Sequence, residues 1–128
     1  MKEIVELREI IEATTQEIYS AWLNSQLHTQ MTGGEANCSD KVGASFTAWD
    51  GYISGKNLEL FKNKKIVQTW RTSEFSENDE DSILTIQLSE IKEVTELTLT
   101  HKNIPKGKTQ YKQGWIDHYF VPMKEFFK

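Results

Sequence analysis

The C-terminal segment, residues 109–127, is the feature that most constrains the fold of this chain. At about 100° per residue, a helix over this segment carries two neighbouring apolar stripes. The first stripe holds Tyr111, Trp115, His118, Tyr119, Pro122 and Phe126, and the second holds Ile116, Phe120, Met123 and Phe127. Together they cover roughly half of the circumference, more than a helix on a flat surface needs. The segment therefore predicts a helix held in a concave surface, and a bent β-sheet is the surface that fits.

Two residues inside this segment disfavour a regular helix. Gly114 costs about 1 kcal/mol relative to alanine, and an interior Pro122 costs about 3 kcal/mol. We expect Gly114 to allow close packing beside Trp115, and Pro122 to bend the helix around the sheet. A helix that ends before Pro122 is the alternative.

The middle of the chain predicts an antiparallel sheet. An aliphatic run over residues 3–12 is typical of a first strand, and from Ala44 onward apolar side chains alternate with polar ones. The Asp50-Gly51 pair predicts a hairpin turn, because both positions tolerate a positive φ. Gly55 indicates a bulge or a close backbone approach, and we expect a bulge there to make the sheet concave. We expect about six to seven strands in all.

Two short helices are expected between the first strand and this meander. Thr14 and Glu17 have the spacing of a capping box, and a second helical stretch near residues 26–31 ends at Gly33-Gly34. The 128 residues contain no internal repeat or linker. The fold class is therefore α+β, as a single domain over residues 1–128.

Composition limits the binding partners and the cell compartment that we expect for this protein. A net charge of −4 and a pI of about 5.4 do not favour nucleic acid, which needs a concentrated positive field. Cys38 is the single cysteine, so no disulfide forms within the chain. The first residues lack the apolar core of a signal peptide, and no apolar run approaches the roughly 20 residues that cross a bilayer. We predict a cytoplasmic protein with no membrane partner; the sequence leaves its oligomeric state open.

Several short motifs, taken in order, resemble one protein family. They are Met31-Thr32-Gly33-Gly34, residues 49–55 (WDGYISG), residues 66–71 (IVQTWR), Ile104-Pro105, Gln113-Gly114-Trp115 and Tyr119-Phe120. They are similar to the family named for the activator of the ninety-kilodalton heat-shock protein ATPase, in the START-like (SRPBCC, helix-grip) superfamily. The resemblance implies a curved sheet wrapped around a long C-terminal helix. It also implies a heat-shock chaperone as a partner, and hence a link to the stress response.

The residue types favour a binding site over a catalytic one. We expect a cavity between helix and sheet, lined by Phe46, Gln68, Trp70, Trp115, His118 and Tyr119. Pockets for small ligands are mostly apolar with a few placed polar groups, here Gln68 and His118. The predicted function is to hold a small hydrophobic or amphipathic ligand, although the aromatic side chains would also suffice to fill the space completely.

Two other functions stay open. The resemblance favours a module that binds a chaperone. Some START-like relatives are cyclases or hydrolases, and in such an enzyme His118 or His101 would act as acid or base. Each of these histidines would otherwise be a buried side chain satisfied by a neighbour. We expect no catalytic residue and no cofactor.

A metal site is not expected either. Cys38, His28 and Asp40 do not have the spacing of a known ligand set. Cys38 as a nucleophile would need a partnered base, which the sequence does not indicate. His28 lies in a short polar stretch, and we expect it to be exposed.

Overall fold

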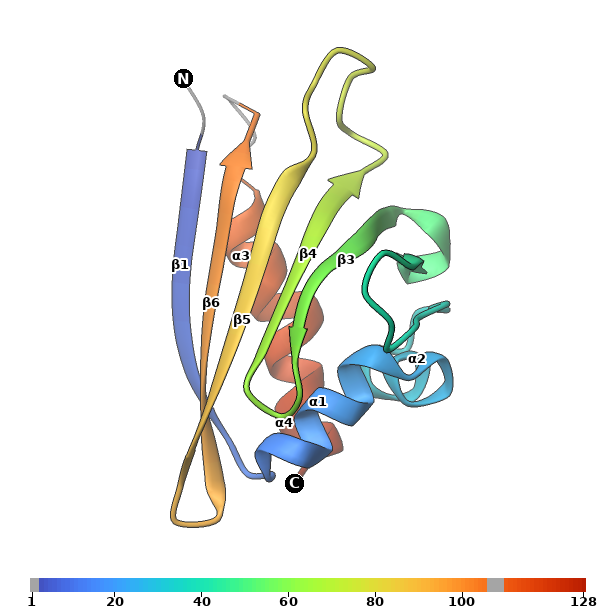
Figure 1. The fold of residues 1–128 in the computed structure, drawn as a ribbon. Coiled ribbons are helices and arrows are strands. Elements are labelled where there is room, and N and C mark those ends of the chain that lie inside the picture. The colour runs from blue at the N-terminus through green and yellow to red at the C-terminus, as the bar shows by residue number, and fades with distance from the viewer. Residues whose placement is uncertain (1–2, 106–109) are drawn as a thin grey trace.

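The strands found among the described residues form one antiparallel sheet that curves around the C-terminal helix (Figure 1). The structure is a computed structural model that describes residues 3–105 and 110–128. The strands are β1 (Glu3–Ile11), β2 (Ser45–Ala48), β3 (Ile53–Phe61), β4 (Lys65–Thr72), β5 (Ser82–Ile91) and β6 (Val94–Ile104). In space their order is β1-β6-β5-β4-β3-β2. The predicted α+β fold, with a curved antiparallel sheet of about six to seven strands, is confirmed, and the sheet in the described residues has six strands.

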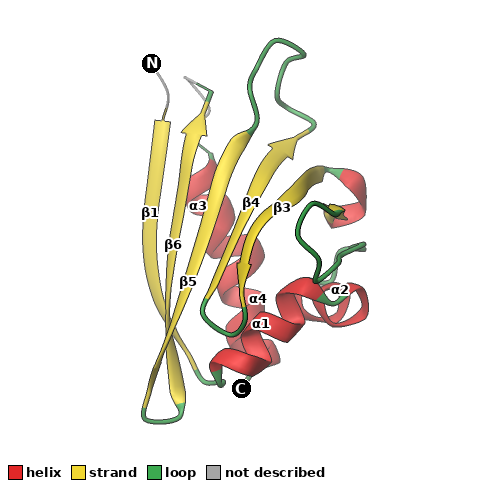
Figure 2. Cartoon of the chain, viewed as in Figure 1, coloured by secondary structure: helices red, strands yellow, loops and turns green. Residues whose placement is uncertain are grey.

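One face of the sheet is apolar because apolar side chains alternate along its central strands. Leu84 and Ile86 of β5 are fully buried, and Ile86 lies opposite the equally buried Leu99 of β6. The helices lie against this face (Figure 2). The core of the molecule is therefore the layer between the sheet and the C-terminal helix.

Two helices follow β1, namely α1 (Thr15–Leu23) and α2 (Ser25–Thr32). The predicted capping box is present: Thr14 Oγ1 accepts from the N–H of Glu17 at 3.1 Å, and the N–H of Thr14 donates to Glu17 Oε1 at 2.9 Å. Helix α2 ends at Gly33, whose φ of 89° gives the left-handed conformation that terminates a helix. Local sequence signals therefore set these boundaries.

The Asp50-Gly51 pair lies in the predicted turn between β2 and β3. Trp49, Asp50 and Gly51 form one 3-10 turn with φ values of 51°, 58° and 91°. Because Trp49 also has a positive φ, strand β2 ends one residue earlier than the alternation indicates.

Gly55 is a position of close backbone approach. A Cβ atom built on it would lie 2.0 Å from the carbonyl oxygen of Thr69 on β4. The register of β3 against β4 shifts between Asn57 and Glu59. The bulge is therefore at Leu58, and the expectation of a bulge at Gly55 is wrong.

A continuous helix covers residues 111–126. It consists of α3 (Tyr111–Trp115), a π-helical turn η2 (Ile116–Phe120) and α4 (Val121–Phe126). In the π turn the N–H of Val121 donates to the carbonyl of Ile116, five residues back. Pro122 follows directly and the helix passes through it, so the alternative in which the helix ends before Pro122 is wrong. Residue 109, where the predicted helix begins, lies outside the described residues.

Two other expectations for this helix are wrong. The buried arc is centred near Tyr119, so His118, at its margin, is exposed rather than turned to the sheet. A Cβ atom on Gly114 would meet no atom within 4 Å outside its own turn of helix. Gly114 is therefore not needed for close packing beside Trp115.

None of the helices in the described part of the chain has the length and apolarity to cross a membrane.

Gly55→Ala should lower the free energy of unfolding by about 1–3 kcal/mol, because overpacking of a well-ordered site costs that much. The added methyl overlaps the Thr69 carbonyl, which is held in the sheet. Urea unfolding followed by tryptophan fluorescence measures the change. Gly114→Ala is the matched control: it adds the same atom in open space and should raise stability by about 1 kcal/mol through helix propensity. Equal effects of the two substitutions would contradict the close approach at Gly55.

Candidate functional site

A buried histidine on β6 holds the first half of the C-terminal helix. The indole N–H of Trp115 donates to Nδ1 of His101 at 3.0 Å. Because an indole N–H can only donate, the proton of His101 is on Nε2, which lies 2.6 Å from Ser82 Oγ and donates to it. The Ser82 hydroxyl in turn donates to the backbone carbonyl of Trp70. Burial lowers the pKa of His101 to about 3, so this chain of bonds contains a neutral imidazole.

A second histidine, on α2, holds the next turn of the same helix. Nδ1 of His28 donates to the carbonyl oxygen of Trp22 at 2.8 Å, and Nε2 therefore accepts from the hydroxyl of Tyr119 at 3.0 Å. Burial lowers the pKa of His28, and the bond to Trp22 opposes that change to a smaller extent. The side chain is 1% exposed because α2 packs against α4. The expectation of an exposed His28 is wrong.

Aromatic rings fill the interior between the helix and the sheet. The ring centroids of Trp22 and Tyr119 are 4.8 Å apart, those of Trp70 and Trp115 4.9 Å, and those of Trp115 and Tyr119 5.0 Å. All four side chains are 3% exposed or less. The central space in which the sequence suggested a cavity is therefore packed with side chains.

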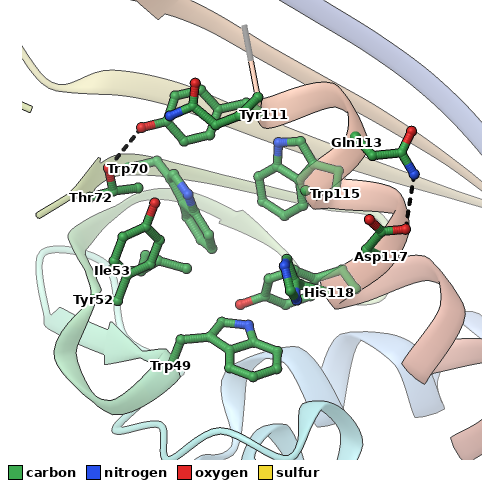
Figure 3. Close-up of a pocket in the computed structure, with 13 residues that line it drawn as sticks. Trp49, Tyr52, Ile53, Trp70, Thr72, Tyr111, Gln113, Trp115, Asp117 and His118 are labelled. Atoms are coloured by element: carbon green, nitrogen blue, oxygen red, sulfur yellow. Dashed lines mark hydrogen bonds between the residues drawn. The ribbon is translucent and has the colours of Figure 1, made fainter. Parts of the chain in front are cut away.

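A pocket of about 530 Å³ opens beside this packed layer, where the C-terminal helix passes the β2–β3 turn and the end of β4 (Figure 3). We call it the aromatic pocket, and its lining is mostly apolar. Trp49, Trp70 and Trp115 contribute indole rings from the turn, the sheet and the helix. Other lining residues include Tyr52, Tyr111, Gln113, Asp117, His118 and Tyr119. Much of its polar wall, Asp117 to Tyr119, belongs to the π turn.

Trp49 is held at the pocket by the residues that follow α2. A Cβ atom on Gly34 would lie 2.5 Å from Trp49 Cε3, so only glycine allows the indole to lie this close. The N–H of Glu35 donates to Asp50 Oδ1 at 3.0 Å, and the N–H of Asp50 donates to the carbonyl of Glu35 at 2.9 Å. The Trp49 indole meets the His118 ring nearly edge-on, with centroids 5.4 Å apart. Two motifs separated in the sequence thus build one wall.

Hydroxyl groups lie on the opposite side of the pocket. The Tyr111 hydroxyl and Thr72 Oγ1 are 2.7 Å apart, and the Tyr52 hydroxyl donates to Glu74. Burial, helped by Glu74, raises the pKa of Tyr52 to about 12, and burial raises the pKa of Tyr111. Both phenols therefore stay uncharged at neutral pH and can hydrogen-bond as neutral hydroxyl groups. Asp117, in contrast, brings an exposed carboxylate to the pocket.

The structure brings four of the six predicted site residues to the aromatic pocket, namely Trp70, Trp115, His118 and Tyr119. Phe46 and Gln68 lie outside its lining. Phe46 is buried against Trp70, with ring centroids 5.5 Å apart. The amide of Gln68 accepts from the indole N–H of Trp22 at 3.1 Å and donates to Asn57 at 2.8 Å. Both side chains serve the core behind the pocket.

Several lining residues were not predicted from the sequence, among them Trp49, Tyr52, Tyr111 and Asp117. Trp49 and Tyr52 flank the Asp50-Gly51 turn, and large aromatic residues on both sides of a hairpin turn were the available signal. For Tyr111 and Asp117 the sequence offered no more than a place on the helix.

The remaining candidate chemistry is weak. Burial raises the pKa of the Cys38 thiol to about 11, which disfavours the nucleophilic thiolate. Both ring nitrogens of His28 and of His101 are already engaged in hydrogen bonds. Within the described ranges no group of three or more metal-ligating side chains comes together. His118 is the histidine that reaches the aromatic pocket.

Comparison with known proteins assigns the chain to a protein family. The family model described as Activator of Hsp90 ATPase homolog 1-like protein matches residues 12–128. The chain belongs to this family.

The curated relatives of this family member are longer than the chain itself. The Activator of 90 kDa heat shock protein ATPase homolog 1 of Homo sapiens is 29% identical over 126 residues, covering 96% of this chain and 36% of the human protein. The homologue of Dictyostelium discoideum is 24% identical over 124 residues, covering 96% of this chain and 32% of that protein. The chain thus spans about a third of the length of these relatives.

Solved structures confirm the family fold. An HSP90 activator from Plasmodium falciparum superposes with a TM-score of 0.88 at 27% identity, over 96% of this chain and 94% of that chain. The Aha1 dimer from Colwellia psychrerythraea superposes with a TM-score of 0.83 at 17% identity, over 98% of this chain and 96% of that chain. The second similarity concerns the fold alone.

The buried histidines should make the stability of this family member depend on pH. An unfolded chain binds a proton on histidine near pH 6.5, whereas folded His101 binds one only near pH 3. Below pH 6.5 the unfolded state therefore holds more protons. The free energy of unfolding should fall between pH 7 and pH 5, approaching about 1.4 kcal/mol per pH unit for each such histidine. Urea titrations at pH 7, 6 and 5 measure the slope.

His101→Gln should flatten this slope and lower stability at pH 7, because glutamine does not reproduce the bonds to both Trp115 and Ser82. His118→Gln, which removes an exposed histidine and leaves the core intact, is the matched control. Because burial also lowers the pKa of His28, a smaller slope should remain in the His101→Gln protein. A slope as steep as that of the unaltered protein would contradict the assignment to His101.

Proposed function

We propose that this domain binds a small hydrophobic or amphipathic ligand in the aromatic pocket. The observation that supports the proposal is a mostly apolar pocket of about 530 Å³, inside the roughly 300–1,000 Å³ range of small-molecule sites. Two of its indoles, Trp70 and Trp115, belong to the packed core. The indole of Trp115 donates to His101, and the chain of bonds from His101 through Ser82 ends on the backbone carbonyl of Trp70. A pocket formed in advance loses less free energy to ordering when a ligand enters.

The distribution of polar groups supports an amphipathic ligand. An apolar body would lie against Trp49, Trp70 and Trp115. A polar end would lie near Asp117 and His118 on the π turn, which are both exposed. The proposed ligand-binding residues are therefore the three tryptophans, Tyr119, His118 and Asp117, in place of the set that includes Phe46 and Gln68.

Gly114 offers a way to close the pocket without disturbing the core. It lies in the pocket wall, and a side chain there would meet no atom within 4 Å of its Cβ. Gly114→Leu should fill the opening while improving helix propensity. A thermal-shift screen of fatty acids and aromatic metabolites, followed by native mass spectrometry, would identify a ligand. Titration calorimetry would then compare the variants.

We expect Gly114→Leu to weaken ligand binding about tenfold or more, because side-chain volume replaces ligand volume. Gly114→Ala is the control for helix propensity and should bind like the unaltered protein. Failure of every ligand class to bind, or equal affinity in the Gly114→Leu protein, would refute the proposal.

The second candidate is binding to a ninety-kilodalton heat-shock chaperone. It is supported by family membership and by the structure of an HSP90 activator from Plasmodium falciparum, 94% of which aligns with this chain. A cytoplasmic location is part of this candidate, since the single Cys38 calls for no oxidising compartment.

Addition of the purified domain should raise the ATPase turnover of such a chaperone, with saturation as the domain concentration increases. The assay should use the chaperone of the same organism as the ATPase. Retention of that chaperone on the immobilised domain measures binding directly. Unchanged turnover and no retention at tens of micromolar domain would exclude this candidate.

A further inference from the structure

The two outer strands of the sheet differ in how their free sides are covered. Strand β2 has four residues, and Asn37 bridges its free side by exchanging backbone hydrogen bonds with Thr47, each 2.9 Å. Strand β1 has nine residues and pairs with β6 on one side (Figure 2). Over the described ranges no strand pairs with its other side. A long open edge of this kind is a template for another strand.

The outward-facing side chains of β1 form a self-complementary series. Ile4, Glu6, Arg8 and Ile10 are exposed, and they alternate with side chains turned toward the helix layer. Along the strand their order is apolar, acidic, basic, apolar. In the reversed strand the apolar positions coincide with these and the acidic and basic positions are exchanged. In an antiparallel pair of two copies centred on Leu7, each Glu6 lies opposite an Arg8 and each Ile4 opposite an Ile10.

We propose that the domain forms a symmetric dimer in which two β1 strands pair antiparallel about Leu7 and join the two sheets into one. The occupant of the open edge is thus a second copy of this chain. A twofold interface must be self-complementary, and β1 meets that condition in charge and in apolar contacts.

Exposure of the same side chains supports the pairing. Ile4 is 59% exposed and Ile10 is 45% exposed, both large values for isoleucine on a strand. Among the described residues Arg8 has a loose contact: its Nε is 3.8 Å from Glu96 Oε2, and its side chain is 71% exposed. The pairing would cover both isoleucines and give each Arg8 a carboxylate directly opposite. On the helix side, the two Leu7 side chains would meet across the axis.

Charge reversal tests this register. Opposite charges directly across a strand pair stabilise it and like charges destabilise it, and the twofold axis doubles each effect. Glu6→Arg would place arginine opposite arginine, and Arg8→Glu would place glutamate opposite glutamate. Each single variant should raise the dimer dissociation constant about tenfold or more. The double variant Glu6→Arg/Arg8→Glu restores opposite charges and should restore the dimer.

Sedimentation velocity over a concentration series measures the dissociation constants, and circular dichroism verifies that each variant is folded. Glu59→Arg is the matched control, because it makes the same charge change at an exposed position of β3, away from β1 in the strand order. It should leave the dimer unchanged.

Three results would overturn the proposal. The first is a protein that stays monomeric at millimolar concentration. The second is a dimer that both single variants leave intact, which would place the interface elsewhere. The third is a double variant that remains as dissociated as the single variants, which would contradict the register centred on Leu7.

Discussion

The C-terminal helix is fixed in position and in rotation about its axis because two of its side chains donate hydrogen bonds to buried histidines. Trp115 and Tyr119 lie one turn apart on the same face, and their polar hydrogens go to His101 on β6 and His28 on α2. A buried donor that loses its partner costs about 1–3 kcal/mol, so a rotated helix would lose both bonds at once. Both histidines must also stay neutral, and each has one tautomer that satisfies its partners. The packed aromatic layer and the aromatic pocket depend on this arrangement.

The location of the pocket follows from how the helix is held. Four aromatic side chains fill the centre of the molecule, and the aromatic pocket opens beside them, where the helix passes the β2–β3 turn (Figure 3). The π turn presents Asp117 and His118 there, and Gly34 allows the indole of Trp49 to come close. Irregular backbone in the helix and in the turn thus gives this region its polar wall and its third tryptophan.

The sequence predicted part of this site. Helical periodicity placed Trp115 and Tyr119 on the inner face, because that periodicity depends only on residues in the same helix. It misplaced His118, which lies at the margin of the buried arc. His28 was misjudged for a related reason: α2 is polar by its own composition, but the packing of α4 against it buries the imidazole. Gln68 and Phe46 do face the interior, but they contact other core side chains and do not line the pocket: Gln68 bonds to Trp22 and Asn57, and Phe46 packs against Trp70.

The sequence by itself determined the kind and order of the elements: alternation for the strands, the Thr14 capping box and Gly33 for the helix ends, and Asp50-Gly51 for the turn. These signals act between residues that are close along the chain, so each can be read locally. Only the tertiary structure decided that the interior is filled, that the histidines at positions 28 and 101 are neutral hydrogen-bond partners, and that the pocket lies at the margin. Those outcomes depend on the combined volume and the donors and acceptors of side chains from distant segments, which no local pattern encodes.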